Sequence, residues 1–296
     1  MTTVVSIINL KGGVAKTTTT VQLAECLASE FSKKVLVIDL DPQTNATIAL
    51  IGEERWDELD KQKQTLFYLF NDKLEETSFF NIDKSIQPSV SNLRLSSLSL
   101  LASSIKFIDI QDRLGDIASK FDYAIAPMEV LKSAVYSKLK NYDYVLIDCP
   151  PNLGLITRNG IEISDYYLIP AIPDKLSTYG LPQIIKQIYK FGEARKLPIK
   201  CLGLIITKYS SSSNTHVQVM RDLPARFGTI FNDLKIPKAP VFSTVMPQAN
   251  TTAEAMIFED IPKSFREKYG RSKSGNYYLY EYVISLTKEL IKYAKT

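Results

Sequence analysis

The sequence contains few of the residues that build metal sites and disulfide frameworks. Its 296 residues include one histidine, His216, and three cysteines, Cys26, Cys149 and Cys201. The cysteine spacing fits neither a disulfide framework nor a C-x-x-C metal site, and the single histidine has no second one with which to hold a metal. We therefore expect reduced thiols and a surface histidine in a reducing compartment.

Long apolar runs are also missing. No stretch approaches the ~20 consecutive apolar residues that span a bilayer. The first residues have neither the basic leader nor the apolar length of a signal peptide. With 45% hydrophobic and 23% charged residues, the composition is typical of a globular protein. We expect a cytoplasmic protein without a membrane partner.

Two glycines are missing from a segment that otherwise looks like a phosphate-binding loop. The segment NLKGGVAKTTTT, residues 9–20, follows a short β-branched run. The usual pattern G-x-x-x-x-G-K-[ST] has glycine six residues and one residue before its lysine, and here Leu10 and Ala15 stand in those places before Lys16. A second lysine, Lys11, precedes the glycine pair. A strict pattern search would miss this loop.

The residue types in this loop nevertheless suit a phosphate. A glycine-rich turn between a strand and a helix directs backbone N–H groups at an anion, and the helix N-terminus adds partial positive charge. Gly12 and Gly13 allow close backbone approach. Lys16 supplies a full charge at the phosphates and Thr17 a hydroxyl for Mg²⁺. We predict a negative φ at Ala15, because a Cβ at positive φ costs roughly 1–2 kcal/mol.

Short runs that are apolar at almost every position alternate with segments of helical periodicity. Such runs suit parallel strands that are buried on both faces. They are TTVVSIIN (2–9), KKVLVIDLD (33–41), NLRLSSLS (92–99), YDYVLIDCPP (142–151), DYYLIPAIP (165–173) and KCLGLIITKYS (200–210). The alternation predicts an α/β fold with a doubly wound, mostly parallel sheet flanked by helices, as in P-loop NTPases. Without linker-like stretches or repeats, we expect one domain over residues 1–296.

The alternation weakens between Glu53 and Gln87. Residues 53–76 have helical periodicity instead. The packing groups of this segment are Trp56, Leu59, Leu66, Phe67, Leu69 and Phe70.

Acidic residues stand at the ends of two predicted strands. Asp39 and Asp41 end the run VLVIDLD, and Asp148 ends YVLID. Because ligands of such sheets bind at the carboxyl ends of the strands, these carboxylates are placed for a magnesium nucleotide site. An alternative for Asp39 is to cap the turn that follows, leaving Asp41 as the residue that matters.

Five segments together resemble the ParA/MinD family of deviant Walker A ATPases, and most closely its ParA branch. They are KGGVAKTT, DLDPQTNAT, YDYVLIDCPPNLG, STYGLPQI and VFSTVMP. The resemblance runs from Val4 to about Glu254 and leaves residues 53–87 unmatched. It implies an ATPase with ATP and Mg²⁺ as cofactors.

The resemblance also implies roles for individual residues. Lys11 would reach across a nucleotide-sandwiched homodimer to the partner's phosphates, and Asp41 would position the attacking water, which makes Lys11, Lys16 and Asp41 the catalytic set. Thr17 would be the Mg²⁺ ligand, with Asp39 and Asp148 holding the hydration shell. The nucleotide contacts would be Lys11, Gly12, Gly13, Val14, Ala15, Lys16, Thr17 and Thr18 at the phosphates, and Thr207, Lys208, Pro247 and Gln248 at the adenine.

Positive charge gathers near the C-terminus. The chain has a net charge of +4, and residues 261–296 hold eight basic and three acidic residues, a net charge of +5. Such a segment suits phosphate backbones or anionic lipid, although charge blocks also form solvated helix faces. By resemblance to ParA, the ATP-bound dimer binds DNA nonspecifically on the nucleoid. The DNA-binding candidates are Arg221, Arg226, Lys263, Arg266, Lys268, Arg271 and Lys273.

The resemblance further implies a ParB-like or other adaptor that stimulates hydrolysis and so releases the DNA. A plasmid, a chromosome or a protein assembly could be the cargo. Three alternatives remain open. One is a MinD-like ATPase that binds membrane through residues 280–296, whose apolar stripe (Val283, Leu286, Leu290 and Tyr293) could equally pack on its own domain. The others are an iron–sulfur reductase similar to nitrogenase iron protein, with Cys149 as its one cysteine near the switch region, and a nucleotide-dependent scaffold.

Overall fold

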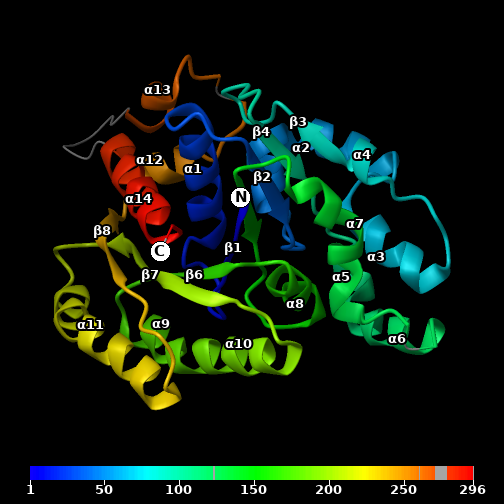
Figure 1. Cartoon of the computed structure of the whole chain (residues 1–296). Coiled ribbons are helices and arrows are strands. Elements are labelled where there is room, and N and C mark those ends of the chain that lie inside the picture. Colours follow the sequence, from blue (N-terminus) through cyan, green and yellow to red (C-terminus); the bar gives the residue numbers. More distant parts are fainter. Residues whose placement is uncertain (123, 260, 271–278, 296) are drawn as a thin grey trace.

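A single β-sheet runs through the molecule (Figure 1). The computed structural model describes residues 1–122, 124–259, 261–270 and 279–295. Within this part of the chain, eight strands lie in the order β3-β4-β2-β5-β1-β6-β7-β8, and every neighbouring pair is parallel except β3 and β4. The predicted doubly wound α/β fold is confirmed.

The strand predictions are right at five of six apolar runs and shifted at the sixth. The run at 92–99 begins with a turn, and its strand starts only at Leu98. Two strands were not predicted, because β3 has three residues and β8 carries the polar residues Ser243 and Thr244. The strands are β1 Thr3–Ile7, β2 Val35–Asp39, β3 Ile86–Pro88, β4 Leu98–Leu101, β5 Tyr144–Asp148, β6 Tyr166–Ala171, β7 Lys200–Tyr209 and β8 Val241–Pro247.

Apolar side chains form one core on each face of the sheet, because successive strand residues point to opposite faces. Along β2, Leu36 and Ile38 enter one core, and Val35 and Val37 enter the other. Helices α3, α5, α7, α8, α10 and α11 cover the first face, and α1, α2, α13 and α14 cover the second (Figure 1). The helices are α1 Lys16–Ser29, α2 Asn45–Lys61, α3 Leu66–Glu75, α4 Ile82–Ser85, α5 Phe107–Ile110, α6 Ile117–Lys120, α7 Val130–Leu139, α8 Leu155–Glu162, α9 Lys175–Tyr179, α10 Leu181–Arg195, α11 Asn214–Leu234, α12 Asn250–Glu254, α13 Phe265–Gly270 and α14 Leu279–Tyr293.

Helices α2 and α3 account for most of the segment between Glu53 and Gln87, as its helical periodicity predicts. Leu59, Leu66 and Phe70 are fully buried. Helix α2 is kinked at Gly52, where φ is 75° and a Cβ would come within 2.8 Å of the Phe258 ring. The segment is therefore packed onto the sheet domain at both ends.

The apolar stripe of α14 is buried against the protein itself. Val283, Leu286 and Leu290 are fully buried and pack in the core that α1 shares. The Glu289 carboxylate accepts hydrogen bonds from the backbone N–H groups of Ser243 and Thr244, both at 2.7 Å, on the edge strand β8. The stripe is thus occupied and does not lie open for a membrane. In the described part of the chain, no helix is long and apolar enough to cross a bilayer.

A buried ion pair fixes α13 to α1. Lys268 donates to the Glu25 carboxylate at 2.7 Å, and the two side chains are 3% and 0% exposed. Tyr269 and Ser91 donate to the same carboxylate. The expectation that Lys268 contacts DNA is wrong, because its ammonium is turned into the protein to neutralise Glu25.

Replacing Lys268 with alanine should lower the free energy of unfolding by about 3–5 kcal/mol, because Glu25 would stay buried without its cation. Replacing Lys263, an exposed lysine in the same segment, should change it by less than about 0.5 kcal/mol. Urea unfolding followed by circular dichroism measures both. Equal stability of the two variants would show that the pair does not hold this segment.

Candidate functional site

The loop between β1 and α1 is held open over its glycines. The Asn9 side chain donates to the Pro170 carbonyl at 2.7 Å and accepts from the backbone N–H of Lys11 at 3.0 Å, which ties the loop to β6. A Cβ added at Gly12 or Gly13 would meet no atom within 4 Å. The loop therefore leaves free space beside its backbone N–H groups, as an anion requires.

The predicted negative φ at Ala15 is wrong. Ala15 is left-handed, with φ 64° and ψ 33°, and its carbonyl accepts the first helical hydrogen bond of α1 from the N–H of Thr19 at 2.9 Å. This position is the one that the usual pattern fills with glycine, and the turn into α1 demands its conformation whatever residue is present. The strain amounts to roughly 1–2 kcal/mol.

Lys16 lies at the first turn of α1, 6% exposed, with its ammonium 3.3 Å from the Lys11 carbonyl. Burial lowers the pKa of Lys16, against the opposing effect of the nearby carboxylates Asp148 and Asp41. Thr17 donates its hydroxyl to Asp148 at 2.7 Å. The sequence prediction that these residues share one site is met by the geometry.

Asp39 and Asp148 lie side by side at the carboxyl ends of the neighbouring strands β2 and β5, in register and fully buried. Burial raises the pKa of Asp39 to about 7 and that of Asp148 well above its ordinary range, and the charge of Asp39 raises the latter further. Together with the Thr17 hydroxyl, the two carboxylates form an oxygen donor set of the kind that Mg²⁺ prefers.

Asp39 also has the capping role that the sequence left open. One of its oxygens accepts from the N–H and the hydroxyl of Thr47, at 2.9 and 2.7 Å, and the other accepts from the N–H of Asp41 at 3.1 Å. Asp41 is 7% exposed and accepts from the N–H of Gln43. Asp39 therefore fixes both the start of α2 and the backbone of Asp41.

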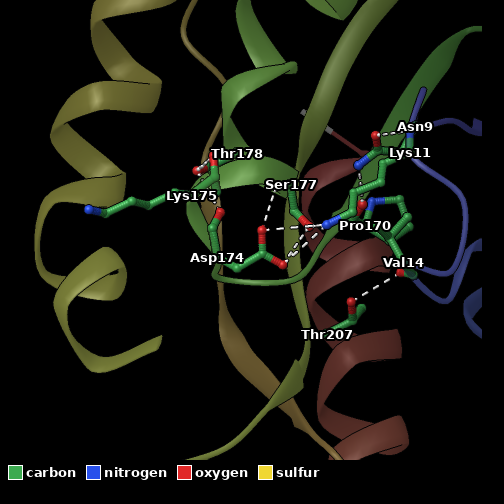
Figure 2. A network of polar contacts seen from close by, with 9 residues as sticks. All are labelled: Asn9, Lys11, Val14, Pro170, Asp174, Lys175, Ser177, Thr178 and Thr207. Carbon is green, nitrogen blue, oxygen red and sulfur yellow. Dashed lines mark hydrogen bonds and ion pairs between the residues drawn. The ribbon is translucent and has the colours of Figure 1, made fainter. Parts of the chain in front are cut away.

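Lys11 points away from its own phosphate loop (Figure 2). Its ammonium lies 3.3 Å from the Asp174 carboxylate and 2.8 Å from the Ser177 hydroxyl, which belong to the N-terminal cap and first turn of α9. Burial opposes, but hydrogen bonds from Ser177 and Lys11 outweigh it and lower the pKa of Asp174. Sequence reasoning missed Asp174, although the segment STYGLPQI begins at its partner Ser177.

A cavity of about 280 Å³ continues from the phosphate loop. All four predicted adenine contacts line it: Thr207, Lys208, Pro247 and Gln248. The Thr207 hydroxyl donates to the Val14 carbonyl at 3.1 Å, which joins the end of β7 to the loop (Figure 2). Ala15, Thr18, Gln22 and Thr252 are also at its wall, and of these Gln22 and Thr252 were not predicted.

The basic candidates for DNA contacts do not gather in one patch. Arg221 and Arg226 are exposed on α11, which covers one face of the sheet. Lys263 and Arg266 are exposed at α13, on the opposite face. Lys268 is buried, as described above. Arg271 and Lys273 lie outside the described residues.

None of the three cysteines has an exposed thiol. Cys149, at the end of β5, and Cys26, within α1, are buried. Cys201 is at the amino end of β7, away from the carboxyl edge that carries the site. Burial raises the pKa of Cys26 and of Cys201 to about 12. The arrangement does not bring two cysteines together.

Comparison with known proteins assigns this chain to a family. The family model AAA_31, described as an AAA domain, matches residues 2–200. The sporulation initiation inhibitor protein Soj of Bacillus subtilis is 29% identical over 253 residues, 85% of this chain and 87% of Soj. The chromosome partitioning protein ParA of Caulobacter vibrioides is 28% identical over 236 residues, 79% of this chain and 80% of ParA.

A solved structure has the same fold. Cobyrinic acid a,c-diamide synthase from Mycobacterium smegmatis, with bound ADP and magnesium, superimposes with a TM-score of 0.65 at 25% identity, covering 88% of this chain and 92% of that one. The chain therefore belongs to the AAA_31 family of AAA domains and, with Soj and ParA among its relatives, to the ParA/MinD family that its motifs predict.

Proposed function

We propose that this protein is a ParA-type ATPase that binds ATP and Mg²⁺ at the loop of residues 9–20, dimerises in that state and binds DNA nonspecifically until hydrolysis releases it. The observation that carries the proposal is the convergence of Lys16 and Thr17 on the buried pair Asp39 and Asp148. The relatives add support, since Soj is a sporulation initiation inhibitor, ParA partitions chromosomes and the structural neighbour holds ADP and magnesium.

The residues of the site divide the work by position. The loop N–H groups and the N-terminus of α1 bind the phosphates, and the Lys16 ammonium adds a full positive charge. Mg²⁺ held by Thr17, with Asp148 and Asp39 around it, neutralises phosphate charge when it is bound. Asp148 already accepts the Thr17 hydroxyl, so it fixes the rotamer of the ligand. Asp41, at the edge of the pair, orients the attacking water.

Lys11 gives the site its dependence on a second chain. Within one chain its ammonium is bound to Asp174 and Ser177, so it contributes nothing to its own phosphates. In the proposed dimer it leaves these partners for the phosphates of the facing chain, where it places positive charge on the charge that develops in phosphoryl transfer. ATP and the partner chain then stabilise one another by linkage.

DNA binding in the proposed dimer uses exposed cations and no base readout. Arg221 and Arg226 on α11, with Lys263 and Arg266 at α13, are the described residues that are free to face solvent. Joining two chains doubles these contacts and steepens the salt dependence, so ATP switches the DNA affinity. A ParB-like or other adaptor stimulates hydrolysis, and the protein thereby segregates or positions a DNA or protein cargo.

Replacing Lys11 with alanine should abolish ATP-dependent dimerisation while leaving the monomer folded. Sedimentation velocity with a non-hydrolysable ATP analogue and Mg²⁺ measures the effect. Lys175→Ala is the matched control, because its ammonium points away from Asp174 (Figure 2) and this variant should dimerise normally. A Lys11 variant that dimerises as wild type does would refute the role in trans.

Replacing Asp41 with alanine should slow ATP hydrolysis by about 100-fold or more, since a group that activates the nucleophile contributes on that scale. The ATP dimer should then persist instead of decaying. Phosphate release and gel filtration measure the two effects. Asp57→Ala, at an exposed aspartate paired with Lys61, should behave as wild type. Unchanged turnover in the Asp41 variant would favour an incidental hydrolysis in a scaffold.

Replacing Arg221 and Arg226 together with alanine should weaken DNA binding for all sequences alike. The slope of log K against log salt should become shallower by about 2, one for each lost phosphate contact. Fluorescence anisotropy with a random-sequence duplex and the ATP analogue measures it. Arg113→Ala, at an exposed arginine paired with Glu75, serves as control. DNA affinity that ignores both salt and nucleotide would contradict the DNA proposal.

A further inference from the structure

Two buried polar atoms in the cavity beyond the phosphate loop have no hydrogen-bond partner. They are Nε2 of Gln22 and the hydroxyl oxygen of Thr252. Within the described residues, one other buried side-chain atom is in this position, the Ser85 hydroxyl, and Ser85 does not line the cavity. Buried polar groups are almost always paired, because an unpaired one carries its full desolvation penalty. These two therefore require an explanation.

A comparison within α1 shows that the unpaired amide is not a general feature of this helix. Glu25, three residues after Gln22, is also buried, and its carboxylate accepts from Ser91, Lys268 and Tyr269. The protein thus supplies three partners to one buried polar side chain and none to the Nε2 group of the other. Gln22 is 2% exposed, so solvent does not replace the missing partner.

The position of Gln22 follows from the helix that carries the phosphate loop. Ala15, Thr18 and Gln22 are spaced by three and four residues, so they lie on one face of α1, and all three line the cavity. Gln22 is about 9 Å farther along the helix axis than Lys16. A ligand whose phosphates lie at Lys16 would therefore extend its other end toward Gln22.

The cavity suits a flat heteroaromatic ring. Its volume of about 280 Å³ far exceeds the ~30 Å³ that one water occupies. Its walls include the apolar residues Met246, Pro247 and Ala253. Apolar walls with a few placed polar groups are typical of small-molecule sites. An amide offers both a donor and an acceptor, and a hydroxyl does the same, which matches the ring nitrogens and exocyclic amino group of a purine.

We propose that Gln22 and Thr252 hydrogen-bond the edge of the purine base and thereby position the nucleotide. The inference rests on the proposed nucleotide binding and deepens it by assigning the residues that recognise the base. Base binding satisfies the two atoms that the protein alone leaves unpaired. Gln22 then links base recognition to the same helix whose first turn holds the phosphates.

The Gln22→Met variant, which keeps the side-chain length without the amide, tests the inference. Calorimetry with Mg²⁺ should give an ATP affinity about 5- to 100-fold below that of wild type, the range expected for one buried hydrogen bond. The affinity for inorganic tripolyphosphate, which has no base, should be unchanged. Thr252→Val, on α12, should show the same selective loss. Gln218→Met, at an exposed glutamine on α11, should change neither affinity.

Two further readouts separate base recognition from a structural role. Without ligand, Gln22→Met should be at least as stable to urea as wild type, because it removes an unpaired buried amide. Purine riboside triphosphate and 7-deaza-ATP each lack one edge atom of ATP. At least one of them should bind wild type more weakly than ATP does, with that difference reduced in the Gln22 variant.

Several results would overturn the inference. Equal ATP affinity of wild type and both cavity variants would remove it, as would equal losses for ATP and tripolyphosphate. Either result would leave the proposed ATPase function intact, because wild type would still bind ATP. A wild-type protein that binds neither compound would defeat the proposed function and this inference together.

Discussion

Two buried carboxylates at neighbouring strand ends are the constraint on which the site depends. Asp39 and Asp148 stand opposite each other in β2 and β5, fully buried, and burial raises the pKa of each. A buried pair of acids is tolerated where hydrogen bonds and cations surround it. Thr47 and Thr17 supply the hydrogen bonds, and the Lys16 ammonium faces Asp148. The parallel sheet is what places strand ends, loop and helix N-terminus at one edge.

Helix α1 connects this centre to the rest of the molecule. Its first turn carries Lys16 and Thr17, its middle presents Gln22 to the base-end cavity, and Glu25 holds Lys268 in the C-terminal segment. Lys11, just before the helix, is bound to Asp174 across the site. In the proposed dimer, the phosphates of the facing chain compete with Asp174 for this lysine. One short segment thus couples nucleotide, partner chain and C-terminal segment in a single account.

Local patterns in the sequence were sufficient for the sheet, the phosphate loop and the acidic strand ends, because each depends on neighbours in the chain. They were insufficient where distant residues decide. Ala15 adopts a left-handed conformation because the turn into α1 overrides its own preference. Lys268 adds to a basic segment by charge count, yet its partner Glu25 is 243 residues away. Gln22 looks like an ordinary polar residue in a helix, and its missing partner is evident only in three dimensions.

The central claim is that Lys11 serves the nucleotide of a second chain. The most direct measurement is a crystal structure of the wild-type protein with a non-hydrolysable ATP analogue and Mg²⁺. The account predicts a two-fold dimer in which the Lys11 ammonium has left Asp174 and lies about 3 Å from a phosphate oxygen bound by the other chain. A structure with the analogue in place and Lys11 still bonded to Asp174 and Ser177 of its own chain would contradict it.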